Sequence, residues 1–483
     1  MRGEYEGSSP GVLEGAERIA LLYRRFQNAT APAPNPQLTC SEMKGSGREA
    51  EALRKTYLFV PSLSPALTPE KGDEIAPRAV KILDMSSAIY HDNQRYRQQL
   101  SPSFAMKRYL DLNALASKKS FFLLGPRQTG KSWLIRDQLK GIKTYNLLES
   151  DTFAKLSKAP QRVREELAGS DRIIVIDEVQ KLPQLLDEVQ LLIEEKGIRF
   201  VLTGSSARKL RTGGANLLAG RALIRHFHPL CYAELGDDLN LHRALACGLL
   251  PSMYLEEDPV ESLEVYAGTY LKEEVVAEGA ARNIPSFSRF LEVAALYNSQ
   301  LINYTNVASD SQVAVSTVRD YYQVLEDTLL GKQLLAWTGS KKRKAIAASK
   351  FYFFDIGVAR ILQGKRTLER NSPDFGEALE TYIGHELWSY IDYVHAGRLD
   401  LNYWRSTSSF EVDFILGRKT AIEVKASQNV TPKMLKGLKA LQEEKFARKH
   451  VCVCLEKVPR TIDGIEILPY KLFLQALWQG EFA

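Results

Sequence analysis

One stretch of the sequence has the residue types and the spacing that bind phosphate groups. An apolar run at residues 121–124 leads into the pattern G-x-x-x-x-G-K-S, and a helical pattern follows at residues 133–139. Glycines let backbone N–H groups turn inward around phosphates, and the helix N-terminus adds partial positive charge. We expect Lys131 to reach the β- and γ-phosphates and Ser132 to ligate magnesium. The loop residues are Gly125, Pro126, Arg127, Gln128, Thr129, Gly130, Lys131 and Ser132.

Polar side chains follow two later apolar runs. Residues 173–176 deliver Asp177 and Glu178 to the carboxyl edge of a predicted parallel sheet, where ligands bind. Asp177 is expected to hold magnesium through water, and Glu178 to polarise the attacking water. Thr203 ends the run at residues 200–202 and is predicted to sense the γ-phosphate or orient the water; a plain turn is the alternative. Arg221 is a candidate arginine finger, in cis or toward a neighbouring subunit, with a surface arginine as the alternative.

The nucleotide predicted from these residues is ATP with Mg²⁺. The sequence has no N-K-x-D motif for guanine recognition and no L-S-G-G-Q motif of transporter ATPases. ATP is therefore favoured over GTP.

The order of patterns along the chain predicts an α/β protein. Short apolar runs alternate with helical patterns in residues 106–235, as a P-loop NTPase with a parallel sheet requires, with strands expected at 121–124, 145–148, 173–176, 200–202 and 223–226. Residues 236–345 look like a helical linker with a winged helix, and residues 346–483 like a second α/β domain. Residues 1–105 hold nine of the 20 prolines and are predicted to be a disordered extension, with Met106 as an alternative start.

Composition excludes little beyond membrane and disulfide-rich proteins. The net charge of +6 permits a nucleic-acid partner without demanding one, because that conclusion needs clustered charge. Five cysteines form no zinc-spaced group. No apolar stretch approaches the ~20 residues of a membrane span, so we expect a cytoplasmic protein.

Several motifs recur together in one family. They are GPRQTGKS, IIVIDEVQKLP, VLTGSSARKL, AGRALIRHFHPLCYAEL, FYFFDIGVAR and FEVDFILGRKTAIEVKAS. From about residue 106 to the end, the chain resembles the prokaryotic family of AAA-type ATPases with a C-terminal domain of unknown function. The resemblance implies an ATPase core, a winged-helix segment and a restriction-endonuclease-like C-terminal domain.

The predicted winged helix contains a basic run. Apolar spacing from Val307 to Leu329 indicates two short helices and a longer one, for which Ser316 is the expected N-cap. Its polar side, with Thr317, Arg319 and Gln323, would enter the major groove of double-stranded DNA. The basic wing is expected to contact phosphates, although a helical bundle with a solvated charge run, or a protein-binding module, explains the pattern equally well. The wing residues are Lys341, Lys342, Arg343 and Lys344.

Carboxylates and a lysine occupy a predicted C-terminal hairpin. Asp413 lies on one strand, and Glu423 and Lys425 share one face of the next. In restriction-type nucleases two carboxylates hold magnesium, while the lysine orients or deprotonates water. Glu380 best matches the helix glutamate that the family resemblance implies, and would complete the metal site. The structural alternative is a Glu423–Lys425 pair worth ~1 kcal/mol or less.

These patterns leave three functions open. The first is an ATPase that controls a DNA- or partner-binding C-terminal half. The second is an ATP-regulated, metal-dependent nuclease, and the third is a nucleotide-gated interaction protein with little turnover. A homo-oligomer is compatible with each of them.

Overall fold

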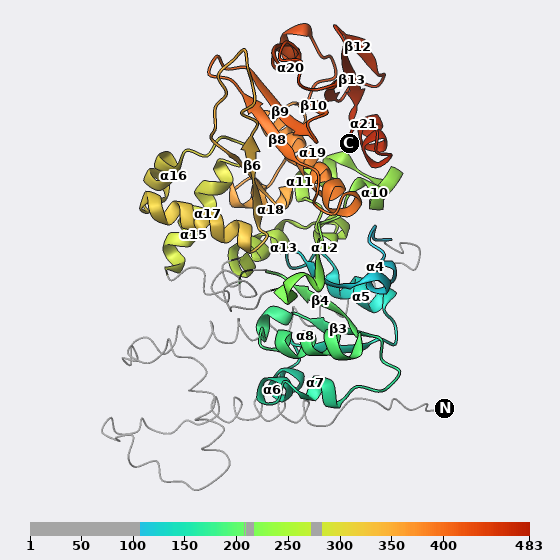
Figure 1. Ribbon diagram of the computed structural model, residues 1–483. Helices are drawn as coiled ribbons and strands as arrows, with labels where there is room; N and C mark the ends of the chain where they lie inside the picture. Colours follow the sequence, from blue (N-terminus) through green and yellow to red (C-terminus); the bar gives the residue numbers. More distant parts are fainter. Residues whose placement is uncertain (1–106, 207, 209–216, 272–282) are drawn as a thin grey trace, which may run out of the picture. The chain divides into compact units, whose positions relative to one another are not determined.

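The computed structural model describes residues 107–206, 208, 217–271 and 283–483 (Figure 1). All of them belong to one unit, Ala105–Ala483. The predicted extension at residues 1–105 and the alternative start at Met106 lie outside the described residues.

The first sheet is parallel, with five strands in the order β2-β3-β4-β1-β5. Each strand predicted before residue 235 is present. β2 lies two residues earlier than predicted, because Leu148 is exposed and the strand's buried position is Tyr145. The strands are β1 (Ser120–Leu124), β2 (Lys143–Asn146), β3 (Ile173–Asp177), β4 (Arg199–Gly204) and β5 (Ala222–His226).

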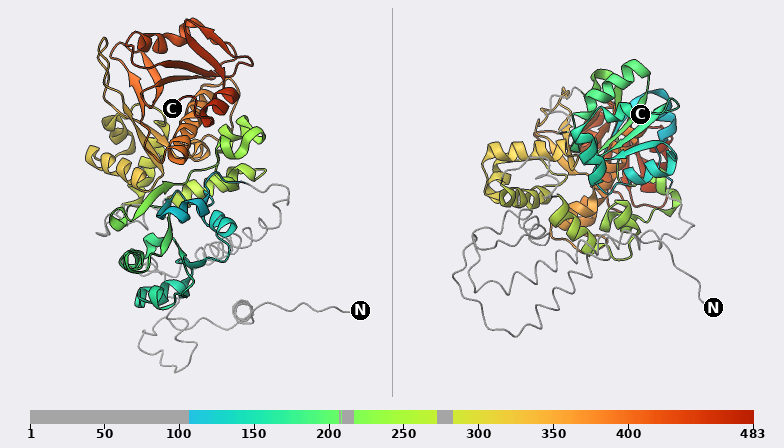
Figure 2. Two further views of the ribbon diagram at one scale, coloured as in Figure 1. Left: turned by 45° about the vertical axis from the view of Figure 1, so that its right-hand side comes forward. Right: turned by 90° about the horizontal axis from the view of Figure 1, so that it is seen from below.

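Helices cover both faces of this sheet, as expected when strands read as continuous apolar runs. Phe122 and Leu124 pack into the core under α6–α8, whereas Phe121 and Leu123 pack under α4 and α5. Figures 1 and 2 show the sheet between these two helical layers. The helices are α4 (Leu112–Lys118), α5 (Lys131–Gln138), α6 (Ser150–Lys158), α7 (Arg162–Glu165) and α8 (Leu185–Lys196).

A helical region follows, with its own aromatic-rich core. Phe287, Phe290 and Tyr322 are buried there and meet edge-on or tilted. The helices are α10 (Tyr232–Leu235), α11 (Leu241–Cys247), α12 (Pro251–Leu255), α13 (Val260–Val265), α15 (Ile284–Leu296), α16 (Tyr304–Ser311), α17 (Val315–Asp327) and α18 (Ile356–Leu362).

Helices α15–α17 precede a β-hairpin in the order predicted from the sequence. β6 (Gly331–Ala336) pairs antiparallel with β7 (Lys350–Phe353), and Leu301 makes an isolated bridge to Lys350. The predicted cap at Ser316 is wrong. The N-cap of helix α17 is Ala314, two residues earlier than predicted, and the helix begins at Val315.

The second sheet is mixed, with eight strands in the order β12-β13-β11-β10-β9-β8-β6-β7. Helix α19 (Pro373–Val394) and helix α21 (Tyr470–Trp478) contribute to the core on one face, and α20 (Lys436–Gln442) to the core on the other. The predicted boundary between residues 345 and 346 falls inside the β6–β7 hairpin, which therefore joins the two predicted segments. The remaining strands are β8 (Leu401–Arg405), β9 (Glu411–Leu416), β10 (Thr420–Lys425), β11 (Lys449–Cys454), β12 (Arg460–Ile462) and β13 (Ile465–Pro469).

Candidate functional site

The phosphate loop connects β1 to α5, as the sequence predicts. Gly130 has φ +93° and Gln128 has φ +62°, so the loop turns through two left-handed residues before the helix begins. This conformation favours glycine at residue 130. A Cβ on Gly125 would lie 2.2 Å from the carbonyl oxygen of Phe227, so the first glycine is required by the close approach of β5.

Lys131 is buried against its own loop. Its Nζ donates to the carbonyl oxygens of Gly125 at 2.6 Å and Pro126 at 2.9 Å, while Thr129 Oγ1 also donates to Pro126. Lys131 is only 5% exposed, so its side chain is buried over the loop. A buried cation beside a helix N-terminus fits a phosphate ligand.

Asp177 brings two hydroxyl groups together at the carboxyl edge of the sheet. Ser132 Oγ donates to Oδ2 at 2.9 Å, and Thr203 Oγ1 donates to Oδ1. Thr203 also accepts a bond of 3.1 Å from the backbone N–H of Glu178. Ser132, Asp177, Glu178 and Thr203 therefore lie together beside the loop. A carboxylate with a serine hydroxyl is an oxygen donor set suited to Mg²⁺.

Glu178 follows Asp177 in the left-handed conformation, with φ +62°. Its Oε2 accepts a 2.5 Å bond from Gln180 Nε2, which also contacts Ser205 Oγ at 3.0 Å. Gln180 therefore fixes the side chain of Glu178 and ties it to the loop after β4. Sequence reasoning missed Gln180, because an amide two residues beyond the carboxylate has no distinctive pattern.

Arg221 lies at the opposite edge of the sheet. Ala222 pairs with Ser120 and His226 with Leu124, so the phosphate loop follows the far end of this strand pair. At about 3.3 Å per residue the separation is roughly 15 Å. Arg221 instead pairs with Glu194. The predicted finger in cis is therefore wrong, and only a role toward a neighbouring subunit stays a prediction.

Arg108 holds the phosphate loop from outside the motif. Its guanidinium donates to the carbonyl oxygens of Thr129 and His228, and to Glu234 Oε1 at 2.8 Å. It stacks 4.0 Å from the ring centroid of Phe227. Burial opposes its charge, but Glu234 outweighs burial and raises the pKa of Arg108. The signal was missed because Glu234 is 126 residues away in sequence.

The contacts of β5 continue into α19. His228 Nε2 lies 2.7 Å from Oδ2 of Asp392, which also contacts Lys332 Nζ at 3.1 Å. Burial lowers the pKa of His228 to about 4, so the ring is neutral near pH 7. Burial alone would raise the pKa of Asp392, but Lys332 and the histidines outweigh it and lower that pKa.

The C-terminal carboxylates converge, but around a lysine. Asp413 Oδ2 accepts a 2.8 Å bond from the N–H of Val424, which places its side chain against β10. Glu423 pairs with Lys425 on that strand. Lys350 lies 3.0 Å from Glu380 and 4.0 Å from Asp413.

The predicted metal site at Glu380, Asp413 and Glu423 is therefore not formed as expected. Within the described ranges no group of three or more His, Cys, Asp and Glu side chains is arranged to hold a metal ion. The reason is the ammonium of Lys350, which lies within 4.0 Å of two of these three carboxylates.

Burial also acts on the protonation of this cluster. Burial, and next the charge of Glu380, raise the pKa of Asp413 to about 6. Burial and the charge of Asp413 raise the pKa of Glu423 well above its ordinary value. Its Oε2 has no hydrogen-bond partner and is buried. Both shifts favour the protonated forms of these two carboxyl groups.

The predicted DNA-facing groups are partly engaged. Arg319 lies 4.5 Å from the ring centroid of Tyr304, and Gln323 donates to Asp327 at 3.1 Å, whereas Thr317 is half-buried. Arg343 pairs with Glu443 at 2.7 Å. The side chains of Lys341, Lys342 and Lys344 are exposed.

Family models match three successive parts of the chain. Residues 117–236 match the model described as an AAA domain. The chain carries an AAA domain. Residues 238–369 match a domain of unknown function (DUF8612), and residues 375–473 match another (DUF4143). The boundary of the AAA domain agrees with the five-stranded parallel sheet.

Two relatives come from mycobacteria. They are the uncharacterized protein Mb2031c of Mycobacterium bovis and the uncharacterized protein Rv2008c of Mycobacterium tuberculosis. Each is 27% identical over 338 residues, which cover 68% of this chain and 74% of theirs.

A solved structure is also similar to this chain. It is that of the Aeropyrum pernix ORC1 protein in complex with DNA. The match covers 64% of this chain and 96% of the ORC1 chain, at 13% sequence identity and a TM-score of 0.21. A TM-score this low does not establish a shared fold. The AAA domain is assigned from the family match and the parallel sheet.

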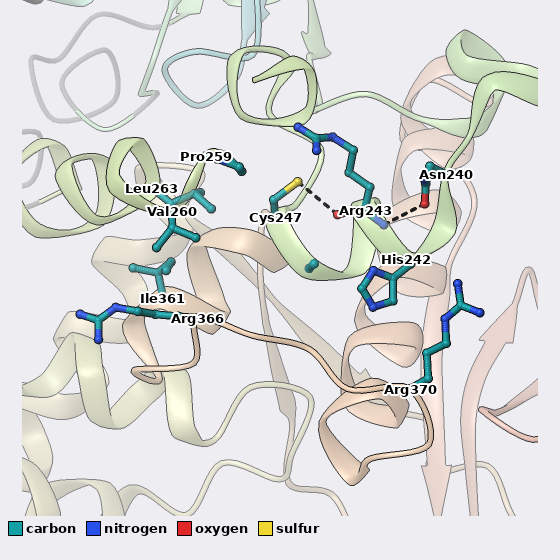
Figure 3. Close-up of a pocket in the computed structure, with 11 residues that line it drawn as sticks. Asn240, His242, Arg243, Cys247, Pro259, Val260, Leu263, Ile361, Arg366 and Arg370 are labelled. Atoms are coloured by element: carbon teal, nitrogen blue, oxygen red, sulfur yellow. Dashed lines mark hydrogen bonds between the residues drawn. The ribbon is translucent and has the colours of Figure 1, made fainter. Parts of the chain in front are cut away.

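A separate cavity of about 380 Å³ lies outside the AAA domain, between α11, α13 and α18. Figure 3 shows Arg366 and Arg370 on opposite sides of it, so their charges do not converge. Arg366 pairs with Glu264, and Arg243 donates to the carbonyl oxygen of Tyr254. We assign no ligand to this cavity.

Among the residues that the structure describes, no helix is both long enough and apolar enough to cross a membrane.

Proposed function

We propose that the protein hydrolyses ATP with Mg²⁺ and passes its nucleotide state to a C-terminal half that binds DNA or a protein partner. The observation that carries this proposal is the cluster of Ser132, Asp177, Glu178 and Thr203 beside the phosphate loop. In this proposal residues 106–235 are the ATPase domain, residues 236–345 the helical linker and winged helix, and residues 346–483 a restriction-endonuclease-like domain.

The residues of the loop would bind the triphosphate. Backbone N–H groups of residues 125–132 would cradle it, and Lys131 would exchange its carbonyl contacts for the β- and γ-phosphates. Ser132 and Asp177 would hold the magnesium ion, which would supply positive charge to neutralise the phosphates. Glu178, fixed by Gln180, would orient and polarise the attacking water.

A contact between the AAA domain and α17 supports the coupling. Arg208 Nη1 lies 3.3 Å from Oδ2 of Asp327, and Ser206 Oγ donates to the Asp327 carbonyl oxygen at 3.4 Å. Both residues follow β4, whose end carries Thr203. A shift of Ser206 and Arg208 on nucleotide binding would therefore reach the last turn of α17.

The nature of the C-terminal ligand follows from the exposed lysines of the wing. Lys341, Lys342 and Lys344 offer three solvent-facing charges, which favours a polyanion such as double-stranded DNA. The nuclease alternative keeps its hairpin with Asp413, Glu423 and Lys425 but requires a metal ion. The third alternative is a protein whose interaction with a partner is gated by nucleotide and that hydrolyses little ATP. It requires only the contact of Ser206 and Arg208 with Asp327.

Substitutions in the full-length protein test the proposal. Lys131→Ala should abolish ATP binding, because it removes the charge that meets the phosphates. Glu178→Gln should keep binding and lose turnover by a hundredfold or more, on the order expected for a general base. ATP affinity by calorimetry and phosphate release measure the two effects.

Matched controls are Lys140→Ala and Glu195→Gln, both exposed on the same domain. Normal turnover by Glu178→Gln would remove Glu178 from the reaction. Unchanged ATP affinity in Lys131→Ala would reject the phosphate site. Binding without turnover in the wild type would favour the gated interaction protein.

A further inference from the structure

The C-terminal hairpin presents the residue types of a divalent-metal site, yet another strand places a cation among them. Lys350 is the first residue of β7 and pairs with Leu334 of β6. Its relative exposure is 3%, so its ammonium is enclosed by protein. An enclosed ammonium is tolerated only where carboxylates surround it.

The contacts of Lys350 come from two elements of the C-terminal domain. Nζ lies 2.7 Å from Glu411 Oε1 on β9 and 3.0 Å from Glu380 Oε1 on α19. Asp413 Oδ1 is 4.0 Å away. A magnesium ion in the same space would need these oxygens at about 2.1 Å. The ammonium and the ion therefore exclude each other.

The remaining oxygens of the predicted metal ligands are largely occupied. Glu380 Oε1 also accepts a 2.7 Å bond from Tyr352 Oη. Asp413 Oδ2 accepts from the N–H of Val424 at 2.8 Å. Oε2 of Glu423 is buried without a partner. The occupied oxygens of Glu380 and Asp413 would have to give up these bonds before they could ligate an ion.

The charges of the cluster nearly balance without a metal ion. Two lysines and one arginine face the carboxylates, and Arg405 Nη1 is 3.1 Å from Glu411 Oε2. Carboxylates that repel each other become favourable when cations lie between them. The carboxylates are Glu380, Glu411, Asp413 and Glu423, and the cations are Lys350, Lys425 and Arg405.

We propose that Lys350 is the built-in cation of this carboxylate cluster, which therefore takes no divalent ion and fastens the β6–β7 hairpin to α19 and β9. The carboxylates serve a mechanical purpose. They hold the hairpin that follows α17 and carries the basic run, so movement of β7 is transmitted to α19 and β9.

Manganese binding to nucleotide-free, full-length protein tests the proposal. All variants carry Asp177→Asn, which removes any ion held beside the phosphate loop. When Lys350 is present, the amount of bound Mn²⁺ measured by electron paramagnetic resonance should be the same with and without Asp413→Asn. Lys350→Met, which keeps the aliphatic volume, should lower Tm by several degrees, because it leaves carboxylates buried without a counter-ion.

Lys350→Met should also gain one Mn²⁺ site that raises its Tm and is lost on adding Asp413→Asn. Lys332→Met is the control, since it removes a lysine of the neighbouring strand β6 that is paired with Asp392 of α19 instead. Mn²⁺ bound with Lys350 present, and lost in Asp413→Asn, would overturn the proposal even if Lys350→Met failed to fold. An unchanged Tm in Lys350→Met would overturn it as well. Neither outcome depends on ATP turnover.

Discussion

Asp177 orients two hydroxyl groups with one carboxylate. Ser132 donates to one oxygen and Thr203 to the other, so the loss of either hydroxyl would change the position of the Asp177 carboxylate. The two partners come from the phosphate loop and from the end of β4, which are neighbours only because β1 pairs with β4. The register of the sheet thus sets the geometry of the site.

Arg108 should position the phosphate loop. Arg108→Lys keeps a cation near Glu234 but loses the fork that reaches the carbonyl oxygens of Thr129 and His228. Each such bond to a charged group is worth roughly 1.5–3 kcal/mol. We expect ATP affinity to fall by on the order of tenfold or more, measured by calorimetry. Arg136→Lys, exposed on α5, should leave it unchanged, and equal affinities in the two variants would contradict the role of Arg108.

The residues that the sequence could predict are those joined by short spacing. The loop from Gly125 to Ser132 and the pair Asp177–Glu178 each lie at a strand end, and a strand end is visible in a sequence. Arg108 and Lys350 could not be predicted in this way. Arg108 acts on Thr129 and Glu234, and Lys350 meets Glu411 from a different strand, so their roles exist only after the chain has folded.

At the scale of elements, contacts between distant segments again could not be predicted from the sequence, whereas local patterns could. The five strands of the first sheet are apolar runs, and all were predictable. In the second sheet the hairpin of β9 and β10 was predictable. The extent of that sheet was not, because β6, which the sequence assigns to the preceding segment, pairs in parallel with β8. The predicted winged helix has the expected order of helices and hairpin, but its hairpin is part of the eight-stranded sheet.

The basic wing should govern the salt dependence of DNA binding. Replacing Lys341, Lys342 and Lys344 with alanine should flatten the slope of log K against log salt by about two to three units, since each phosphate contact contributes ~0.9. Arg343 is left in place because it pairs with Glu443. Fluorescence anisotropy with duplex DNA at several salt concentrations gives the slope.

The control for the wing carries alanine at Lys118, Lys119 and Lys140, three exposed lysines of the AAA domain. It makes the same change in net charge. A slope that falls equally in both variants would show that the wing has no special part in binding.

Helix α19 carries a buried carboxylate that makes stability depend on pH. Glu386 accepts a 2.7 Å bond from the N–H of Tyr232 and a 3.0 Å bond from Trp478 Nε1. Burial raises its pKa to about 7, although these bonds oppose the shift. The native state therefore binds a proton that the unfolded state, with a pKa near ~4.3, has lost. Its stabilising contribution is present below pH ~4.3 and is lost as pH rises through about 7.

Glu386→Gln should remove this dependence. The variant should gain stability relative to the wild type between pH 5 and 7.5, by up to roughly 3 kcal/mol. The stability of the variant must be compared with that of the wild type at each pH, because other groups also titrate. Burial lowers the pKa values of His228 and His385, so these rings favour the native state as pH rises. Urea unfolding at several pH values measures it. Glu377→Gln, partly exposed on the same helix, should show no such trend, and a parallel pH profile for Glu386→Gln would contradict the assignment.

At the scale of the whole molecule, two of the contact sets that join the AAA domain to later parts of the chain start at the ends of its strands. One passes from the loop after β4 to the end of α17, through Arg208 and Asp327. The other passes from β5 to α19, through His228 and Asp392. Both begin at strands next to β1, at the edge that carries the phosphate loop. Nucleotide binding at that edge can therefore act on both.

The contact at Asp327 gives the coupling a direct test. A non-hydrolysable ATP analogue should slow amide hydrogen exchange in α17, because we expect nucleotide binding to strengthen the Arg208–Asp327 pair at the last turn of this helix. Asp327→Asn should abolish that slowing while ATP affinity stays within about twofold, since Asp327 belongs to the last turn of α17 and not to the phosphate loop. Asp320→Asn makes the same charge change on an exposed face of the same helix and should retain the slowing. If Asp327→Asn responds to the analogue as the wild type does, the Arg208–Asp327 pair does not carry the nucleotide state. The same exchange measurement on α19 then tests the route through His228 and Asp392.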